Sequence, residues 1–449
     1  MELKKYRLGD IAEIIGGVSY SPKDICTGGI RILRGGNIQN QHIELKTDDV
    51  FLPISYKNNI SQIYVGDTIL VASTGSVDVL GKAATCFQYT EDVQIGAFLR
   101  IIRPKADKYT MLISSALSSD YFKRYIKAQA KGTSINNITL GYLRDFEIYA
   151  PHDFTGLSHL SANIENKICL NRAINDNLEA MAKQLYDYWF VQFDFPNEEG
   201  KPYKSSGGAM VWNEKLKREI PVGWSVKNLG QIATSYQQGL IRSNNQLSTD
   251  SKYGYLKMGD LDGKGQYTLQ GLTRTNATNE EVDLYSLHKG DFLINVRNSK
   301  EIVGKTCLIG YVERNTLYNH MLVRLDFKDV STFYMNLLFN SEFMYKALDG
   351  LKQGTTTVIA LYQSDLYRLP ILIPAPCVME RFLKITDSIL DQKEIISHEI
   401  AELTKQRNEL LPLLMNGQAT VNYHLSSQNC FKDSTNLSSI SPIFSQNSA

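Results

Sequence analysis

The chain repeats one pattern after about 220 residues, and this duplication limits the folds open to it. The stretch LGDIAEIIGG that begins at Leu8 recurs as LGQIATSYQQG from Leu229. A Gly-Thr element at Gly132 recurs at Gly354, and each copy is followed by a Leu-rich run that ends at proline. Solenoid repeats have only about 20 to 45 residues, so this period is too long for one. The sequence therefore predicts two copies of one domain.

Each copy mixes strand and helix patterns. Short β-like runs such as DTILVAS and FLINV alternate with turns rich in Gly, Asn and Asp. Helical patterns follow at residues 111–130 and 332–351. A chain of 449 residues is also too long for one ordinary core. We therefore expect an α+β fold with two similar mixed α/β domains.

Each copy ends in an extended helical pattern whose apolar residues are spaced by three and four. Such spacing predicts a seam between two helices, with members Ile174, Leu178, Met181, Leu185, Ile396, Ile400, Leu403 and Leu410. The alternative is that each helix packs only on its own domain, but about 30 residues give about 45 Å, longer than one such domain needs. Because the order is domain, helix, domain, helix, a paired seam would be antiparallel. The two domains would then be related by a pseudo-two-fold axis.

The chain divides by composition into six predicted segments. Between the first helix and the second copy lies a polar stretch rich in Gly, Pro and Ser, which we expect to be a connector. The end of the chain is rich in Ser, Asn and Gln without periodicity, so we expect disorder there. The expected segments are domain one (1–155), its helix (156–195), the connector (196–222), domain two (223–375), its helix (376–416) and the tail (417–449).

The sequence lacks the usual motifs of an enzyme or a membrane protein. No apolar run of about 18 residues is present, and the N-terminus does not resemble a signal peptide. The six cysteines are scattered, which favours reduced thiols in a cytoplasm and no metal site. No Asn/Asp-Pro-Pro-Tyr element for methyl transfer occurs, and SKEIVGKT lacks the first glycine of a phosphate loop. We expect no catalytic residue, metal or bound cofactor in this chain.

Polar loops recur at equivalent places in the two copies, and both copies carry a small excess of basic side chains. Lys and Arg tips, hydroxyls and glycine N–H groups suit a DNA backbone, and Arg or Asn can also read base edges. Each residue taken singly fits an ordinary turn, whereas the duplicated set favours DNA contact. The candidates are Arg34, Asn37, Thr74, Ser76, Lys82, Gly132, Thr133, Ser134 and Asn136 in the first copy, and Lys257, Arg297, Ser299, Lys300, Lys305, Gly354, Thr355 and Thr356 in the second.

Four stretches carry a resemblance to a known family: LGDIAEIIGG, KQLYDYWFVQFDFP, IPVGWSVKNLGQIA and LLPLLMNGQ. From residue 3 to about residue 420, the chain resembles the specificity subunits of type I restriction–modification systems. The resemblance implies two target recognition domains, joined by antiparallel coiled-coil helices, that read a bipartite, asymmetric site in double-stranded DNA. It also implies two methyltransferase subunits that use S-adenosylmethionine, two restriction subunits that use ATP and Mg, and phage defence in a bacterial or archaeal cytoplasm. The family's recognition domains vary too much for base-contact residues to be transferred.

Two other classes of protein stay open from the sequence. One is a two-lobed, non-catalytic scaffold that binds protein or glycan, and the other is a self-contained methylase–nuclease, which the missing motifs disfavour. Salt-dependent binding to DNA would separate a DNA-specificity subunit from a scaffold. The two copies share a frame but differ in their loops, so we expect two unlike half-sites.

Overall fold

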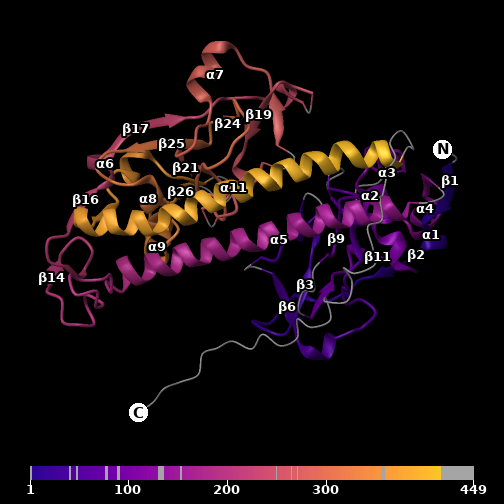
Figure 1. The fold of residues 1–449 in the computed structure, drawn as a ribbon, viewed down its shortest axis with the longest axis horizontal. Helices are drawn as coiled ribbons and strands as arrows, with labels where there is room; N and C mark the ends of the chain where they lie inside the picture. The colour runs from indigo at the N-terminus through magenta and orange to yellow at the C-terminus, as the bar shows by residue number, and fades with distance from the viewer. Residues whose placement is uncertain are drawn as a thin grey trace, which may run out of the picture. The chain divides into compact units, whose positions relative to one another are not determined.

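The computed structural model of the chain forms two compact units, Met1–Asn163 with Arg407–Ala449, and Ile164–Gln406 (Figure 1). It describes residues 3–39, 42–46, 49–75, 79–87, 92–129, 136–151, 154–248, 250–263, 265–269, 272–354 and 359–415. The predicted disordered tail lies outside these residues. In the described part of the chain, no helix is long and apolar enough to cross a membrane.

The first unit has a four-stranded antiparallel sheet at its centre. The strand order is β2 (Ala12–Gly16), β11 (Leu99–Pro104), β7 (Thr68–Val71) and β9 (Ala83–Thr85). Successive strand residues point to opposite faces, so Leu70 packs beneath helices α2 (Thr110–Ser118) and α3 (Asp120–Gln129), while Ile69 packs in a second cluster with Leu33 and Ile95. Both faces are covered, which explains why all of β7 is buried.

Smaller strand groups surround this sheet. Strand β10 (Val93–Ile95) pairs in parallel with β3 (Ile30–Leu33), which pairs on its other edge with β6 (Val50–Leu52). Strand β1 (Leu3–Arg7) pairs antiparallel with β13 (Glu147–Pro151), so the ends of the domain meet. The parallel pair matters for the site, because the chain leaves β10 and β3 at the same end.

The second unit repeats this topology. Its central sheet has the order β17 (Ala233–Gln238), β25 (Leu322–Phe327), β21 (Phe292–Asn295) and β23 (Thr306–Leu308). Strand β19 (Tyr253–Leu256) pairs in parallel with β24 (Leu317–Tyr318), and β16 (Ser225–Asn228) pairs with β28 (Pro370–Ile373). The same strands meet in the same order and directions as in the first unit, so the sequence repeat is a repeat of an α+β fold.

The two predicted helical stretches are each broken by a serine. Ser119 separates α2 from α3, and its hydroxyl accepts a hydrogen bond from Phe122 N at 3.2 Å. Ser341 separates α8 (Thr332–Phe339) from α9 (Glu342–Leu351) in the same way, accepting from Met344 N. A serine that caps the next helix satisfies a backbone donor. The described residues of the predicted helical stretches at 111–130 and 332–351 thus form two short helices each.

Two long helices follow the two domains, α5 (Thr155–Tyr186) and α11 (Pro376–Met415) (Figure 1). Within the second unit, Lys167 forms an ion pair with Glu399 at 2.7 Å, and Glu179 forms one with Lys393. Rising numbers on one helix meet falling numbers on the other, so these parts run antiparallel. Between the two ion pairs, Asn175 donates to Ser397. The contact surface is therefore substantially polar.

The prediction that Met181 lies in the helix seam is wrong. Met181 is 55% exposed, whereas Ala182 is 1% exposed and belongs to the core of the unit. The buried positions step by four from Leu178 to Ala182 and again to Tyr186, which follows the 3.6-residue turn of a straight helix rather than a strict heptad. Of the other predicted members, Ile174, Leu178, Leu185 and Ile396 pack with this core, Ile400 and Leu403 are half-buried, and the Leu410 side chain lies outside the described part.

The predicted connector is folded. A hairpin of β14 (Met210–Asn213) and β15 (Arg218–Pro221) occupies much of residues 196–222. Phe195 stacks on Trp224 at 5.2 Å and on Tyr203 at 4.7 Å between ring centroids. Aromatic residues in and beside this polar stretch bury enough surface to order it, so the connector is a folded one.

Candidate nucleic-acid interface

Arg34 lies on a short turn directly after β3, which we call the Arg34 turn (residues 34–37). The Asn37 side chain accepts a hydrogen bond from Arg34 N at 2.8 Å and donates to Glu44 O and to Asp49 Oδ1 at 2.6 Å. Asn37 is 2% exposed, while Arg34 is exposed. The prediction that Asn37 contacts DNA is therefore corrected, because its amide is used to build the turn that presents Arg34.

The second unit has the same turn after β19, the Lys257 turn (residues 257–260). Here Asp260 takes the place of asparagine, and its carboxylate accepts from Lys257 N at 2.7 Å. Burial raises the pKa of Asp260 to about 6, against the opposing effects of the Lys257 N–H group and the Lys257 charge. Each unit thus presents one cation, Arg34 or Lys257, on an equivalent capped turn.

The described parts of the Gly-Thr motifs, Asn136 and Gly354, lie on strands that pair with or near a second set of candidates. Thr74 on β8 (Ser73–Thr74) pairs with Asn136 on β12 (Asn136–Asn137). In the second unit, Arg297 on β22 (Arg297–Asn298) pairs with Ala360 on β27 (Ile359–Ala360). On the other edge of β27, Ile359 pairs with Gly354 on β26 (Gln353–Gly354). The structure therefore brings together motifs that are far apart in the sequence. The candidates Ser76, Gly132, Thr133, Ser134, Thr355 and Thr356 lie outside the described residues.

Two lysines flank these strands at matching positions. The carbonyl of Lys82 accepts from Val71 N at 2.9 Å, and that of Lys305 accepts from Asn295 N at 2.8 Å. Both side chains are half-buried, and Lys305 Nζ makes a long hydrogen bond of 3.5 Å to Leu261 O. The equivalence of Lys82 and Lys305, proposed from the repeat, is thus a structural one.

The remaining candidates, Ser299 and Lys300, lie in the turn that follows β22. Ser299 is half-buried and Lys300 is exposed. The Lys300 carbonyl accepts a hydrogen bond from Lys352 Nζ at 3.0 Å, which ties this turn to the end of α9. Lys300 is therefore available for electrostatic contact, whereas Ser299 N already bonds to Asn298 Oδ1.

A turn that the sequence analysis did not single out lies at the centre of the first set. This β10–β11 turn (residues 96–99) is held on one side by Gly96 N, which donates to Leu33 O at 2.9 Å. On the other side Ser73 N donates to Phe98 O at 3.1 Å. It therefore lies between the Arg34 turn and β8, and Phe98 is 67% exposed. Aligning IGAFLR with YNHMLVR through the repeat was the signal that could have identified it.

The β24–β25 turn (residues 319–322) is its counterpart in the second unit. Asn319 N donates to Leu256 O, and Val296 N donates to Met321 O, both at 2.9 Å. This turn lies between the Lys257 turn and β22. His320 lies close enough to Arg297 for that charge to add to burial in lowering the pKa of the imidazole. The imidazole is therefore biased towards its neutral form.

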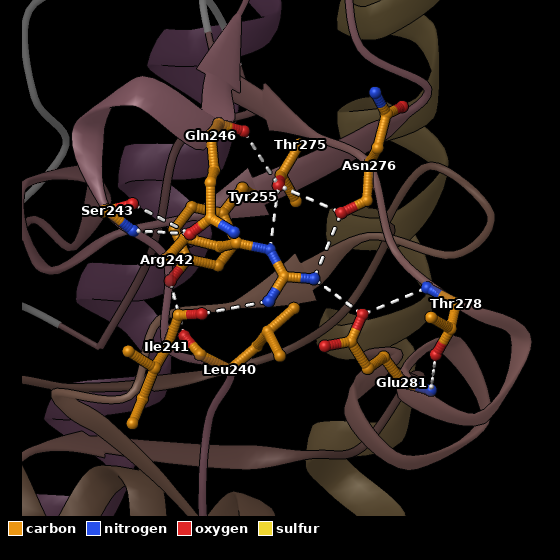
Figure 2. Close-up of polar contacts among 10 residues, drawn as sticks. All are labelled: Leu240, Ile241, Arg242, Ser243, Gln246, Tyr255, Thr275, Asn276, Thr278 and Glu281. Carbon is orange, nitrogen blue, oxygen red and sulfur yellow. Dashed lines mark hydrogen bonds and ion pairs between the residues drawn. The ribbon is translucent and has the colours of Figure 1, made fainter.

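Figure 2 shows how Arg242, which is mostly buried, anchors the loop at residues 240–246. The Arg242 side chain is 10% exposed and pairs with Glu281 at 2.6 Å, while its Nε donates to Thr275 Oγ1 at 3.2 Å. In the same network Tyr255 donates its hydroxyl proton to Leu240 O at 2.5 Å. Leu240 O also accepts from His320 N at 3.1 Å, so the network fixes the backbone of the β24–β25 turn.

In chemical terms, each unit presents cations, hydroxyls and backbone groups on short, hydrogen-bonded turns. Such groups suit phosphate oxygens and base edges. Within the described residues, no group of three or more His, Cys, Asp or Glu side chains could hold a metal ion. The groups on these turns are of the kinds that recognise a polyanion.

Comparisons with known proteins agree with this chemistry. The model of the type I restriction modification DNA specificity domain matches residues 1–180 and 221–405. The MjaIX specificity subunit of Methanocaldococcus jannaschii is 23% identical over 436 residues, covering 92% of this chain and 93% of the relative. The EcoKI specificity subunit of Escherichia coli is 22% identical and covers 89% and 84% of the two chains. A type I S subunit structure from M. genitalium covers 94% and 97%, with 14% identity and a TM-score of 0.42.

Proposed function

The chain belongs to the type I restriction modification DNA specificity domain family, and from this premise we propose that it is the sequence-reading subunit of a type I restriction–modification complex. Each of its two α+β units would read one half of a bipartite, asymmetric site in double-stranded DNA. The observation that carries this proposal is the repeated convergence of three elements: a capped cationic turn, a short strand with its lysine, and a turn between them. The frame is shared and the presented side chains differ, so the half-sites should differ too.

The long helices would act as the spacer between the two units. Antiparallel contacts such as Lys167 with Glu399 support this part of the proposal. We expect two target recognition domains related by a pseudo-two-fold axis, with boundaries near residues 155, 222 and 375. Such a relation would direct the two domains to opposite DNA strands.

Chemistry would reside in the partner subunits. Two methyltransferase subunits would supply S-adenosylmethionine-dependent methylation, and two restriction subunits would supply ATP- and Mg-dependent cleavage. The chain itself would bring these activities to its site, in the cytoplasm of a bacterium or archaeon.

A mobility-shift assay tests this function. The full chain, purified with its methyltransferase subunit, should retard a random-sequence duplex pool, and its affinity should fall about 10³-fold or more between about 50 and 200 mM salt. The complex should methylate one bipartite motif, and the chain alone should not methylate. An affinity for DNA that does not change with salt concentration would contradict the proposal, as would methylation by the chain alone at the rate of the complex. A protein-binding scaffold would give no retarded DNA.

A further inference from the structure

We propose that the β10–β11 turn is a base-reading element and that Phe98 determines specificity in the first half-site, by apolar contact with a thymine methyl group. This inference rests on the proposed function and goes beyond it, because it assigns a residue and a base. In the second unit, the equivalent turn would read its half-site through Met321 with Arg297 beside it.

The position of the turn is the first argument. Two of its backbone groups are bonded to the elements that carry the first unit's candidates: Gly96 N to Leu33 O, next to Arg34, and Phe98 O to Ser73 N, next to Thr74. A residue at its tip is therefore flanked by groups suited to a phosphate backbone. Contacts of that kind position a protein on the duplex, whereas sequence is read by contacts to base edges. We assign that second role to the turn between the two sets of candidates.

The rigidity of the turn is the second argument. Phe98 O accepts from Ala72 N as well as Ser73 N, at 3.0 and 3.1 Å. Arg100 Nη1 donates to Ala97 O at 2.8 Å and to Leu99 O at 2.7 Å, which closes the turn from within. Because the backbone is fixed before binding, little ordering is needed when the aromatic ring meets its target.

The exposure of the ring is the third argument. Phe98 is 67% exposed, the highest value for any phenylalanine in the described part of the chain. A fixed turn that holds an aromatic ring in water forgoes the burial that would stabilise the fold. Single exposed hydrophobic residues are common, but this one lies between two candidate phosphate contacts. Burying the ring against DNA would supply the favourable free energy that its exposure in the free protein forgoes.

The chemistry of the base follows from the side chain. A phenyl ring offers no hydrogen bond, and the thymine C5-methyl group is the apolar feature of the major groove. In the second unit Arg297 is exposed, its charge acts on His320, and the preceding residue, Val296, donates its backbone N–H to Met321 O. Arginine pairs with guanine O6 and N7, so the second turn suits a guanine-containing half-site. The two turns share a backbone and differ in the base they prefer.

The experiment selects binding sites from a random duplex pool with the full chain and its methyltransferase subunit. Wild type is compared with Phe98→Ala, Phe98→Met, Met321→Ala and the control Ile54→Ala, whose side chain is 74% exposed elsewhere in the first unit. Phe98→Ala should lose its preference at one A·T position of one half-site by about 5- to 150-fold. Phe98→Met, which copies the other unit, should keep part of it, and Ile54→Ala should keep all of it. Met321→Ala should affect only the other half-site.

A second measurement isolates the methyl group. In the selected site, deoxyuridine replaces thymine at the affected position, which removes only the C5-methyl group. Wild type should lose affinity for this duplex, while Phe98→Ala should bind both duplexes equally. If wild type selects a motif and Phe98→Ala selects the same motif with equal strength, the inference is wrong and the function stands. If wild type selects no motif at all, the proposed function fails and the inference fails with it.

Discussion

The side-chain amide of Asn171 on α5 donates a hydrogen bond to the carboxylate of Glu399 on α11, at 2.8 Å. Asn171 is only 4% exposed, and Glu399 also pairs with Lys167, so one carboxylate joins two positions of the facing helix. Hydrogen bonds from Lys167 and, to a smaller extent, from Asn171 hold the pKa of Glu399 below its ordinary value. A buried polar contact that forms in only one alignment of two helices favours that register over its neighbours.

This contact predicts a stability effect. Asn171→Ala should lower the free energy of unfolding by about 1 to 2 kcal/mol, because a buried hydrogen bond is lost. Asn177→Ala, on the exposed side of the same helix, should change it by less than about 0.5 kcal/mol. Urea denaturation followed by circular dichroism measures both. Equal effects of the two substitutions would show that the buried amide does not stabilise the helix pair.

The capped turns predict that exchanging asparagine and aspartate affects stability differently in the two copies. Asn37→Asp would place a carboxylate against Asp49, whose Oδ1 now accepts a hydrogen bond from Asn37, and should destabilise the protein by about 3 kcal/mol. Asp260→Asn should leave the protein at least as stable at pH 7, since the amide oxygen can still accept from Lys257 N, as Asn37 does from Arg34 N, and a buried charge is removed. Thermal unfolding of the two variants tests this. A stable Asn37→Asp protein would contradict the role given to Asp49.

The burial of Asp260 predicts that the stability of the protein depends on pH. Its folded pKa of about 6 lies above the ordinary 3.8, so the folded state binds the proton more tightly than the unfolded state. The contribution of this group to the free energy of unfolding therefore increases as pH falls from 7 through 6 towards 4. The difference in melting temperature between wild type and Asp260→Asn should shift in favour of wild type over this range. A difference that stays constant with pH would exclude a raised pKa.

Much of this fold could be predicted from the sequence, because duplication and periodicity are long-range signals. The repeat located both α+β units and showed that their polar loops recur, and in the structure Lys82 and Lys305, like Arg34 and Lys257, occupy equivalent backbone positions. Local chemistry was harder to predict. Asparagine is a residue type that suits both a DNA contact and a buried turn. Only the position of Asp49 in the structure shows that Asn37 has the second role. Phe98 was overlooked because a lone aromatic residue in a strand-rich region is ordinarily core.

The flanking lysines predict a change in salt dependence. Lys82→Ala or Lys305→Ala should weaken binding to all DNA sequences alike and reduce the slope of log affinity against log salt by about one, as expected for one lost phosphate contact. Lys217→Ala, on the β14–β15 hairpin and paired with Glu214, should leave the slope unchanged. Fluorescence anisotropy at four salt concentrations measures the slopes. Altered sequence preference with an unchanged slope would mean that these lysines read bases.

The helix pair predicts that the gap between half-sites can be lengthened by design. Asn175 bonds to Ser397 across the pair, so insertions after Asn175 and before Ser397 fall at facing positions. Seven residues in each helix add two turns, about 10.5 Å, and keep the contacts on both sides in register. At about 3.4 Å per base pair, the methylated motif should gain about three base pairs in its gap and keep both half-sites. The same insertion in α5 alone serves as the control, because it moves Glu179 away from Lys393 and should reduce activity.

Sequencing of methylated DNA reads out the motif. An unchanged gap in the active double insertion would show that the helices do not set the spacing, and a changed half-site would show that they take part in reading it.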